Sequence, residues 1–125
     1  MNARHRSATV IAGALTAALA LTANLAPQAQ AQARGVECGR EAGVGMYCGY
    51  YKGQQYTDSG DRGRHVNEIQ ALIMQTAHYP GRLVVDGQFG PDTVRAVKWY
   101  QKKKLGAGAA DGKVGPRTWK KLRQL

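Results

Sequence analysis

An internal repeat is the feature that most constrains how this chain folds. Residues 86–93 read D-G-Q-F-G-P-D-T, and 25 positions later residues 111–118 read D-G-K-V-G-P-R-T. Both copies follow the pattern D-G-x-φ-G-P-x-T, where φ is apolar, and both lead into apolar residues at helical spacing. The sequence therefore predicts one local structure that is used twice.

Each position of the repeat indicates a turn that runs into a helix. An Asp-Gly pair favours a turn, because the carboxylate accepts backbone N–H bonds and glycine readily adopts a positive φ. The later glycine suits an N-cap, and proline suits the first helical position, where its missing N–H removes no hydrogen bond. The apolar residue at the fourth position of the repeat is expected to pack into the core. The residues with these structural roles are Asp86, Gly87, Gly90 and Pro91 in the first copy and Asp111, Gly112, Gly115 and Pro116 in the second.

Apolar periodicity predicts an all-α unit of three helices. Between residues 66 and 77 apolar side chains recur every three or four positions, and Pro80 and Gly81 then end the pattern. We expect helices near 62–77, 91–104 and 116–124. A unit of this size has a small core, so its main apolar residues should all be inside. These residues are Val66, Ile69, Ile73, Phe89, Val97, Tyr100, Val114, Trp119 and Leu122.

The first 33 residues have the pattern of a secretory signal peptide. Arg4 and Arg6 precede an uncharged apolar stretch, and a small-residue stretch then ends in Ala31-Gln-Ala33. A transmembrane anchor is the alternative, but the apolar stretch is shorter than the roughly 20 residues that a spanning helix needs. We expect cleavage after Ala33, or else after Ala31, and a secreted protein with no transmembrane segment in its mature form.

Cys38 and Cys48 follow the predicted cleavage site within a glycine- and tyrosine-rich segment, residues 34–57. Two cysteines in an exported chain favour a disulfide, which would clip this segment into a loop or a short hairpin. A metal site would need two further ligands, and neither His65 nor His78 has suitable spacing. We therefore divide the chain into a signal peptide (1–33), a disulfide-clipped segment (34–57) and a helical domain (58–125).

The order and spacing of the motifs resemble the peptidoglycan-binding domain, a family of accessory modules on many bacterial wall hydrolases. The family's pattern runs through V-x-x-(I/L)-Q, V-D-G-x-F-G-P-x-T, A-V-x-x-(F/Y)-Q and D-G-x-V-G-P-x-T-W. This chain shows V-N-E-I-Q at 66–70, V-D-G-Q-F-G-P-D-T at 85–93, A-V-K-W-Y-Q at 96–101 and D-G-K-V-G-P-R-T-W at 111–119. The resemblance implies a three-helix bundle with an internal pseudo-repeat and a role in anchoring proteins to peptidoglycan.

Neither catalysis nor metal chemistry is expected. Residues 34–57 are too few to form a catalytic domain. His65, which is three residues before Glu68 on the first helix, and His78 at the far end of that helix are interpreted as two surface histidines. Asp86 and Asp111 would suit a glycosidase, which needs two carboxylates around the bond, but the repeat makes them turn residues. We therefore expect no enzyme, no catalytic residue, no metal and no cofactor.

Trp99 is the best single candidate for ligand contact. On a helical wheel it lies almost opposite the apolar face, so we expect an exposed ring that stacks on a sugar while neighbouring cations meet carboxylates. The alternative is that tyrosines of the N-terminal segment cover it. The other basic residues of the C-terminal half, including Lys103 and Arg123, are expected to form a solvated face. The candidate ligand-binding residues are Trp99, Arg95, Lys98, Lys102, Tyr79 and Arg82.

The charge of the chain favours anionic partners. Residues 1–33 hold two of the 18 basic residues and none of the eight acidic ones, so the mature net charge is +8. For a secreted protein this indicates wall polymers and muropeptide carboxylates rather than nucleic acid. We expect a monomer that is associated with the cell wall and binds the glycan strand or the stem peptide of peptidoglycan. The alternative is an interaction protein that uses the same scaffold for a protein partner or an anionic wall polymer.

Overall fold

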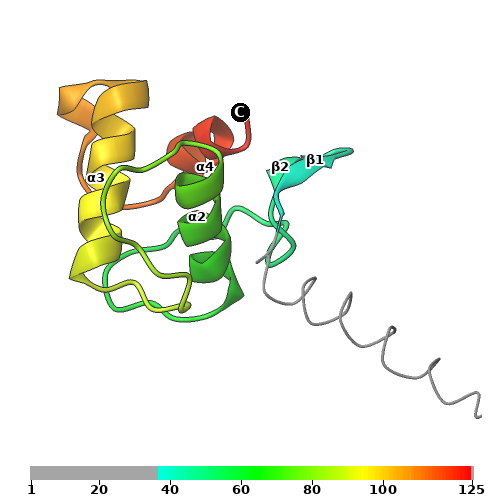
Figure 1. Ribbon diagram of the computed structural model, residues 1–125. Coiled ribbons are helices and arrows are strands. Elements are labelled where there is room, and N and C mark those ends of the chain that lie inside the picture. The colour runs from blue at the N-terminus through cyan, green and yellow to red at the C-terminus, as the bar shows by residue number, and fades with distance from the viewer. Residues whose placement is uncertain (1–36, 125) are drawn as a thin grey trace, which may run out of the picture. The chain divides into compact units, whose positions relative to one another are not determined.

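The computed structural model describes residues 37–124, so the predicted signal peptide at residues 1–33 lies outside the described range. The all-α prediction is confirmed: three α-helices form a bundle, and a two-stranded hairpin is added at its N-terminal side (Figure 1). The elements are β1 (Gly39–Glu41), β2 (Gly45–Tyr47), α2 (Arg64–Gln75), α3 (Pro91–Leu105), the 3-10 helix η1 (Ala107–Ala109) and α4 (Pro116–Leu122). Helix α2 contacts α3, α4 and β2 and is therefore the central element.

Helix α2 is shorter at both ends than the predicted 62–77. Gly63, with a φ of 132°, precedes its first residue, and Thr76 ends it with a backbone N–H bond to the Leu72 carbonyl. Helix α3 runs one residue beyond the prediction, and α4 ends at Leu122 rather than at residue 124. These differences are confined to helix ends, which apolar periodicity does not locate.

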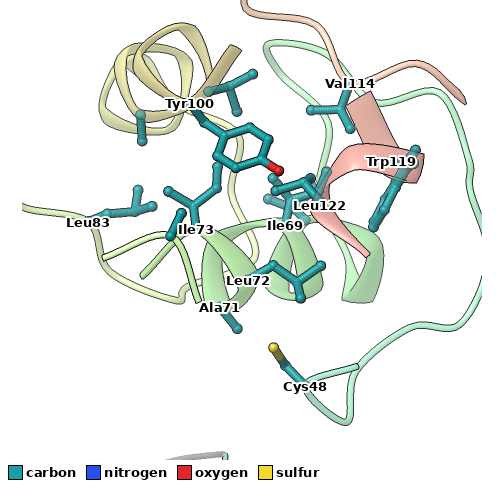
Figure 2. Close-up of a cluster of buried hydrophobic side chains, with 14 of the residues drawn as sticks. Cys48, Ile69, Ala71, Leu72, Ile73, Leu83, Tyr100, Val114, Trp119 and Leu122 are labelled. Atoms are coloured by element: carbon teal, nitrogen blue, oxygen red, sulfur yellow. The ribbon is translucent and has the colours of Figure 1, made fainter. Parts of the chain in front are cut away.

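The core lies between the three helices, and every residue expected inside is buried. Tyr100 reaches from α3 towards Ile69 on α2 and Leu122 on α4 (Figure 2). Its hydroxyl is buried and has no hydrogen-bond partner among the described residues, and burial raises its pKa to about 12. The indole N–H of Trp119, in contrast, donates to the Gln55 carbonyl at 2.7 Å.

The predicted disulfide between Cys38 and Cys48 is confirmed. It closes an antiparallel hairpin in which Arg40 pairs with Met46, so the short hairpin, rather than an irregular loop, is the form that this segment takes. Cys48 is fully buried and contributes to the core, as Figure 2 shows beyond Ala71. The hairpin and the bundle belong to one compact unit, Gly35–Leu125.

Two buried charged residues attach the hairpin to the bundle. The Glu68 carboxylate on α2 accepts hydrogen bonds from the backbone N–H groups of Cys48, Tyr50 and Tyr51, at 2.8–3.2 Å. The Glu68 side chain is fully buried.

Arg123 was expected on a solvated face, but its side chain is buried and only 4% exposed. Its guanidinium donates to the carbonyls of Met46, Tyr51 and Gly53 and lies 5.0 Å from the Trp119 ring centre. A helical pattern at the end of a chain gives no sign of such a role, because the partners come from a segment about 70 residues earlier.

Within the part of the chain that the structure describes, no helix has the length and apolar character needed to cross a membrane.

Candidate functional site

A buried glutamine organises the first copy of the repeat. The Gln70 side-chain nitrogen, on α2, donates to Asp86 Oδ1 at 3.0 Å, to the Gln88 carbonyl at 3.1 Å and to Thr93 Oγ1 at 3.0 Å. Its side-chain oxygen accepts the Gly87 N–H at 3.0 Å. One amide therefore fixes the turn against the preceding helix.

Gln101, on α3, repeats this arrangement in the second copy. It donates to Asp111 Oδ1, to the Lys113 carbonyl and to Thr118 Oγ1 at 2.8–3.1 Å, and it accepts the Gly112 N–H at 2.9 Å. The four hydrogen bonds of one glutamine thus correspond to the four of the other, and both glutamines are fully buried. We call the two arrangements the first and second turn frames.

The glycines and prolines of the repeat occupy corresponding places in both frames. Gly87 and Gly112 adopt φ values of 74° and 79°, which favour glycine. The glycines before the prolines share one extended conformation, with φ of −94° and −93°. Pro91 and Pro116 then start α3 and α4.

The aspartates of the frames serve as acceptors for the turn. Asp86 accepts the Gln88 N–H and Asp111 accepts the Lys113 N–H, each at 2.9 Å. These backbone hydrogen bonds hold the pKa of both carboxyls below the ordinary aspartate value, with the glutamine amides adding to the effect. Both acidic side chains therefore act as hydrogen-bond acceptors within their turns.

The role of the two glutamines was missed, although the sequence carries a signal for it. Residues 66–70 and 97–101 both read V-x-x-φ-Q, as V-N-E-I-Q and V-K-W-Y-Q. The repeat therefore includes the last part of the helix before each turn. A glutamine at a core-facing position in both copies indicates a buried amide with a partner.

Two surface pockets of about 230 Å³ lie at corresponding positions, one beside each turn frame. Seven corresponding positions line both, and five of them hold the same residue type: the glutamine, the aspartate, the N-cap glycine, the proline and the threonine. The first pocket adds Leu83, Val84, Gln88 and Asp92. The second pocket adds Tyr56, Leu105, Ala109, Lys113 and Arg117. A third hollow, of about 280 Å³, lies between residues 59–62 and 88–90.

Trp99 is half-buried, which corrects the expectation of an exposed ring. Tyr79, from the segment between α2 and α3, packs edge-on against it, with ring centres 5.2 Å apart. Lys103 lies one turn further along α3, and its ammonium is 4.9 Å from the Trp99 ring centre. We call this group, Trp99, Tyr79 and Lys103, the tryptophan cluster.

The structure brings only Tyr79 to Trp99 among the other predicted ligand residues. Arg95 forms an exposed ion pair with Asp92. Lys98 lies along the second turn instead, where a methyl group placed on Gly112 would come 3.1 Å from its Cε. Arg82 and Lys102 are exposed and have no ion pair with the described residues. Lys103 was not among the predicted ligand residues, although its spacing of four from Trp99 indicates the contact.

Among residues 37–124, no group of three or more potential metal ligands is close enough to hold an ion. His65 packs against Tyr51, with ring centres 5.9 Å apart.

The fold and the duplicated turn define a small helical module built from two copies of one turn-and-helix unit. This module is similar to a known family: residues 62–122 match the family described as "Putative peptidoglycan binding domain". The match spans all three helices and both turn frames.

Two curated proteins are similar to the chain in sequence. The chain is 37% identical over 120 residues to the zinc D-Ala-D-Ala carboxypeptidase of Streptomyces albus G, covering 94% of this chain and 42% of that protein. It is 36% identical over 74 residues to an uncharacterised protein of Kitasatospora aureofaciens, covering 59% of this chain and 60% of that protein. The chain thus spans less than two thirds of either relative.

A solved structure has a similar fold. It is a peptidoglycan-binding protein of Clostridioides difficile in complex with glutamine hydroxamate, with a TM-score of 0.57 and 26% identity. The similarity covers 70% of this chain and 56% of that one.

Proposed function

We propose that this chain is a secreted, non-catalytic protein that binds peptidoglycan in the bacterial cell wall. The observation that carries the proposal is the match of residues 62–122 to the peptidoglycan-binding family, in the segment that forms both turn frames. A solved structure with a similar fold is itself named a peptidoglycan-binding protein.

The state of the acidic residues supports a non-catalytic role. Asp86 and Asp111 accept hydrogen bonds within their turns, and Glu68 is buried against backbone N–H groups. Each of these carboxylates stabilises the backbone around it, which favours a structural role over acid–base catalysis. We propose that this chain does not share the carboxypeptidase activity for which its Streptomyces relative is named.

The tryptophan cluster is the proposed contact surface for the glycan. An aromatic ring stacks on the apolar face of a sugar. The Lys103 ammonium lies beside the Trp99 ring, where it can form an ion pair with a carboxylate of the ligand. Tyr79 holds the indole in place, so binding would require little reordering. Arg82 and Lys102 are exposed cations that speed encounter with an anionic wall, whereas Arg95 is paired with Asp92 and Lys98 lies along the second turn.

Co-sedimentation with purified peptidoglycan, stripped of teichoic acids, tests the proposal across a salt series. We expect the protein to stay bound at ~0.5 M salt, where attraction between exposed charges is largely screened. Trp99→Ala should release it. Tyr47→Ala is the matched control. The Lys52 ammonium lies 5.2 Å from the Tyr47 ring centre, so the contact is of the same kind, but Tyr47 is on the hairpin and not in the tryptophan cluster.

Circular dichroism of both variants shows whether the fold is kept. If the protein is released by moderate salt and the Trp99 variant behaves as the wild type does, the proposal is wrong. Attraction to a polyanion would then account for the binding.

A further inference from the structure

We infer that the pocket beside the second turn frame binds the free carboxylate of a peptidoglycan stem peptide, whereas the corresponding first pocket does not. The inference rests on the proposed function and names the chemistry and the place of one contact. It is carried by a comparison within the molecule: two pockets share one frame and differ in charge.

The shared frame gives the two pockets the same floor and a similar size. Gln70 and Gln101 make the same four hydrogen bonds, and the two pockets have the same volume, about 230 Å³. All hydrogen-bonding groups of both amides are used within the turns. The glutamines therefore form the pocket floor and have no hydrogen-bonding group left for a ligand.

The charge of the lining residues is reversed between the two copies. Gln88 in the first pocket corresponds to Lys113 in the second, and Asp92 corresponds to Arg117. The lining of the first pocket therefore has two carboxylates and no cation, although Asp92 is paired with Arg95 beside the pocket. The lining of the second pocket has one carboxylate and two cations. An anionic ligand is therefore disfavoured by the first pocket and attracted by the second.

The two cations of the second pocket are largely free to meet a ligand. Arg117 is exposed and has no ion pair with any residue that the structure describes. Lys113 lies 3.9 Å from Asp58 Oδ2, at the limit of an ion pair, and both side chains are exposed. Because the guanidinium is a planar fork that matches a carboxylate, Arg117 is the residue we expect to bind it with two hydrogen bonds.

Tyr56 gives the second pocket an aromatic wall. It is 55% exposed, and Tyr56 and Val84 are the two large apolar side chains left exposed among residues 37–124. The position of its backbone is fixed, because Thr57 exchanges both backbone hydrogen bonds with Val114, at 3.0 and 2.8 Å. A methyl group on Gly115 would lie 3.8 Å from the tyrosine ring, so the ring stands beside the turn.

This second pocket is separate from the tryptophan cluster. Trp99 and Gln101 are two residues apart on α3, and side chains at that spacing point about 200° apart around a helix. The two surfaces can therefore contribute independently, the cluster to a sugar and the pocket to a peptide carboxylate next to Tyr56.

Titration calorimetry with a soluble disaccharide-tripeptide muropeptide tests the inference. The double variant Lys113→Gln, Arg117→Asp gives these two positions of the second pocket the residues that the first pocket has there. We expect its affinity to fall by about tenfold or more, the loss of a charge-assisted contact. The control, Arg40→Asp with Lys104→Gln, changes net charge by the same amount at exposed residues that line neither pocket.

Two further arms identify the ligand group. A muropeptide with amidated carboxyl groups should bind the wild type as weakly as the free acid binds the double variant. Inorganic phosphate should not compete; competition would assign the pocket to a phosphate polymer and overturn the inference.

Equal affinities of the double variant and the control would also overturn it. Retention of insoluble peptidoglycan that depends on Trp99 but not on Lys113 and Arg117 would leave the proposed function intact and refute only this site. Failure of the wild type to bind either form would refute both.

Discussion

Arg123 Nη1 lies 3.3 Å from Glu68 Oε1 in an ion pair whose side chains are 3% and 0% exposed. The pair joins the residue after α4 to the middle of α2. Each partner also binds backbone groups of residues 46–53, so three segments meet at one buried contact. The hairpin is therefore part of the folded unit rather than a loose extension.

Removing one partner of this pair should destabilise the protein strongly. Glu68→Gln leaves the buried guanidinium without a counter-charge, and such changes lower the free energy of unfolding by about 3–5 kcal/mol. Urea unfolding followed by circular dichroism measures the loss. Glu41→Gln is the control, because it breaks the exposed pair with Lys52 and should leave the urea midpoint unchanged. Equal midpoints for the two variants would show that the buried pair is not an anchor.

The two frame glutamines should contribute equally to stability. Gln70→Leu or Gln101→Leu leaves a buried glycine N–H and a threonine hydroxyl without their partner, which lowers the free energy of unfolding by at least about 2 kcal/mol. Gln54→Leu, at an exposed loop position, is the control. A near-neutral effect in either copy would contradict the equivalence of the two frames.

The fold could be predicted from sequence because its signals are local. The D-G-x-φ-G-P-x-T repeat encodes its own turn, cap and helix start, and apolar spacing identifies the core. Glu68 and Arg123 could not be predicted as buried, because their partners are backbone groups of a hairpin distant in sequence. Trp99 was expected to be exposed but is half-buried, because Tyr79 packs against it from a connection whose path no periodicity describes.

Tyr100→Phe should leave the stability unchanged or raise it at neutral pH, because the hydroxyl that is removed is buried and unpaired. The folded-state pKa of Tyr100 is raised to about 12, so the folded state keeps a proton that the unfolded chain loses near pH 10. Stability tied to this group is complete below pH 10 and is lost as the pH rises towards 12. Urea unfolding at pH 7 and pH 11 should therefore show a smaller alkaline loss for the variant. Tyr56→Phe, at an exposed tyrosine, should match the wild type at both pH values.

Acid should weaken both turn frames. The pKa values of Asp86 and Asp111 are lowered in the folded state, so their contribution is present above about pH 4 and is lost as the pH falls through the folded pKa. The free energy of unfolding, measured from pH 6 to pH 2, should fall at the acid end. Asp111→Asn should make that fall shallower. An identical acid profile for this variant would contradict the assigned role of Asp111.

The most direct test of the central claim is an NMR titration of the protein with soluble muropeptide, read at the two tryptophan indole N–H signals. Trp99 lies in the proposed contact surface, while the Trp119 indole is buried and bound to the Gln55 carbonyl, which makes it an internal reference. We predict that the Trp99 signal shifts and saturates at ~0.5 M salt while the Trp119 signal stays in place. If neither signal moves, or if all shifts disappear with salt, the bundle does not bind peptidoglycan through this surface.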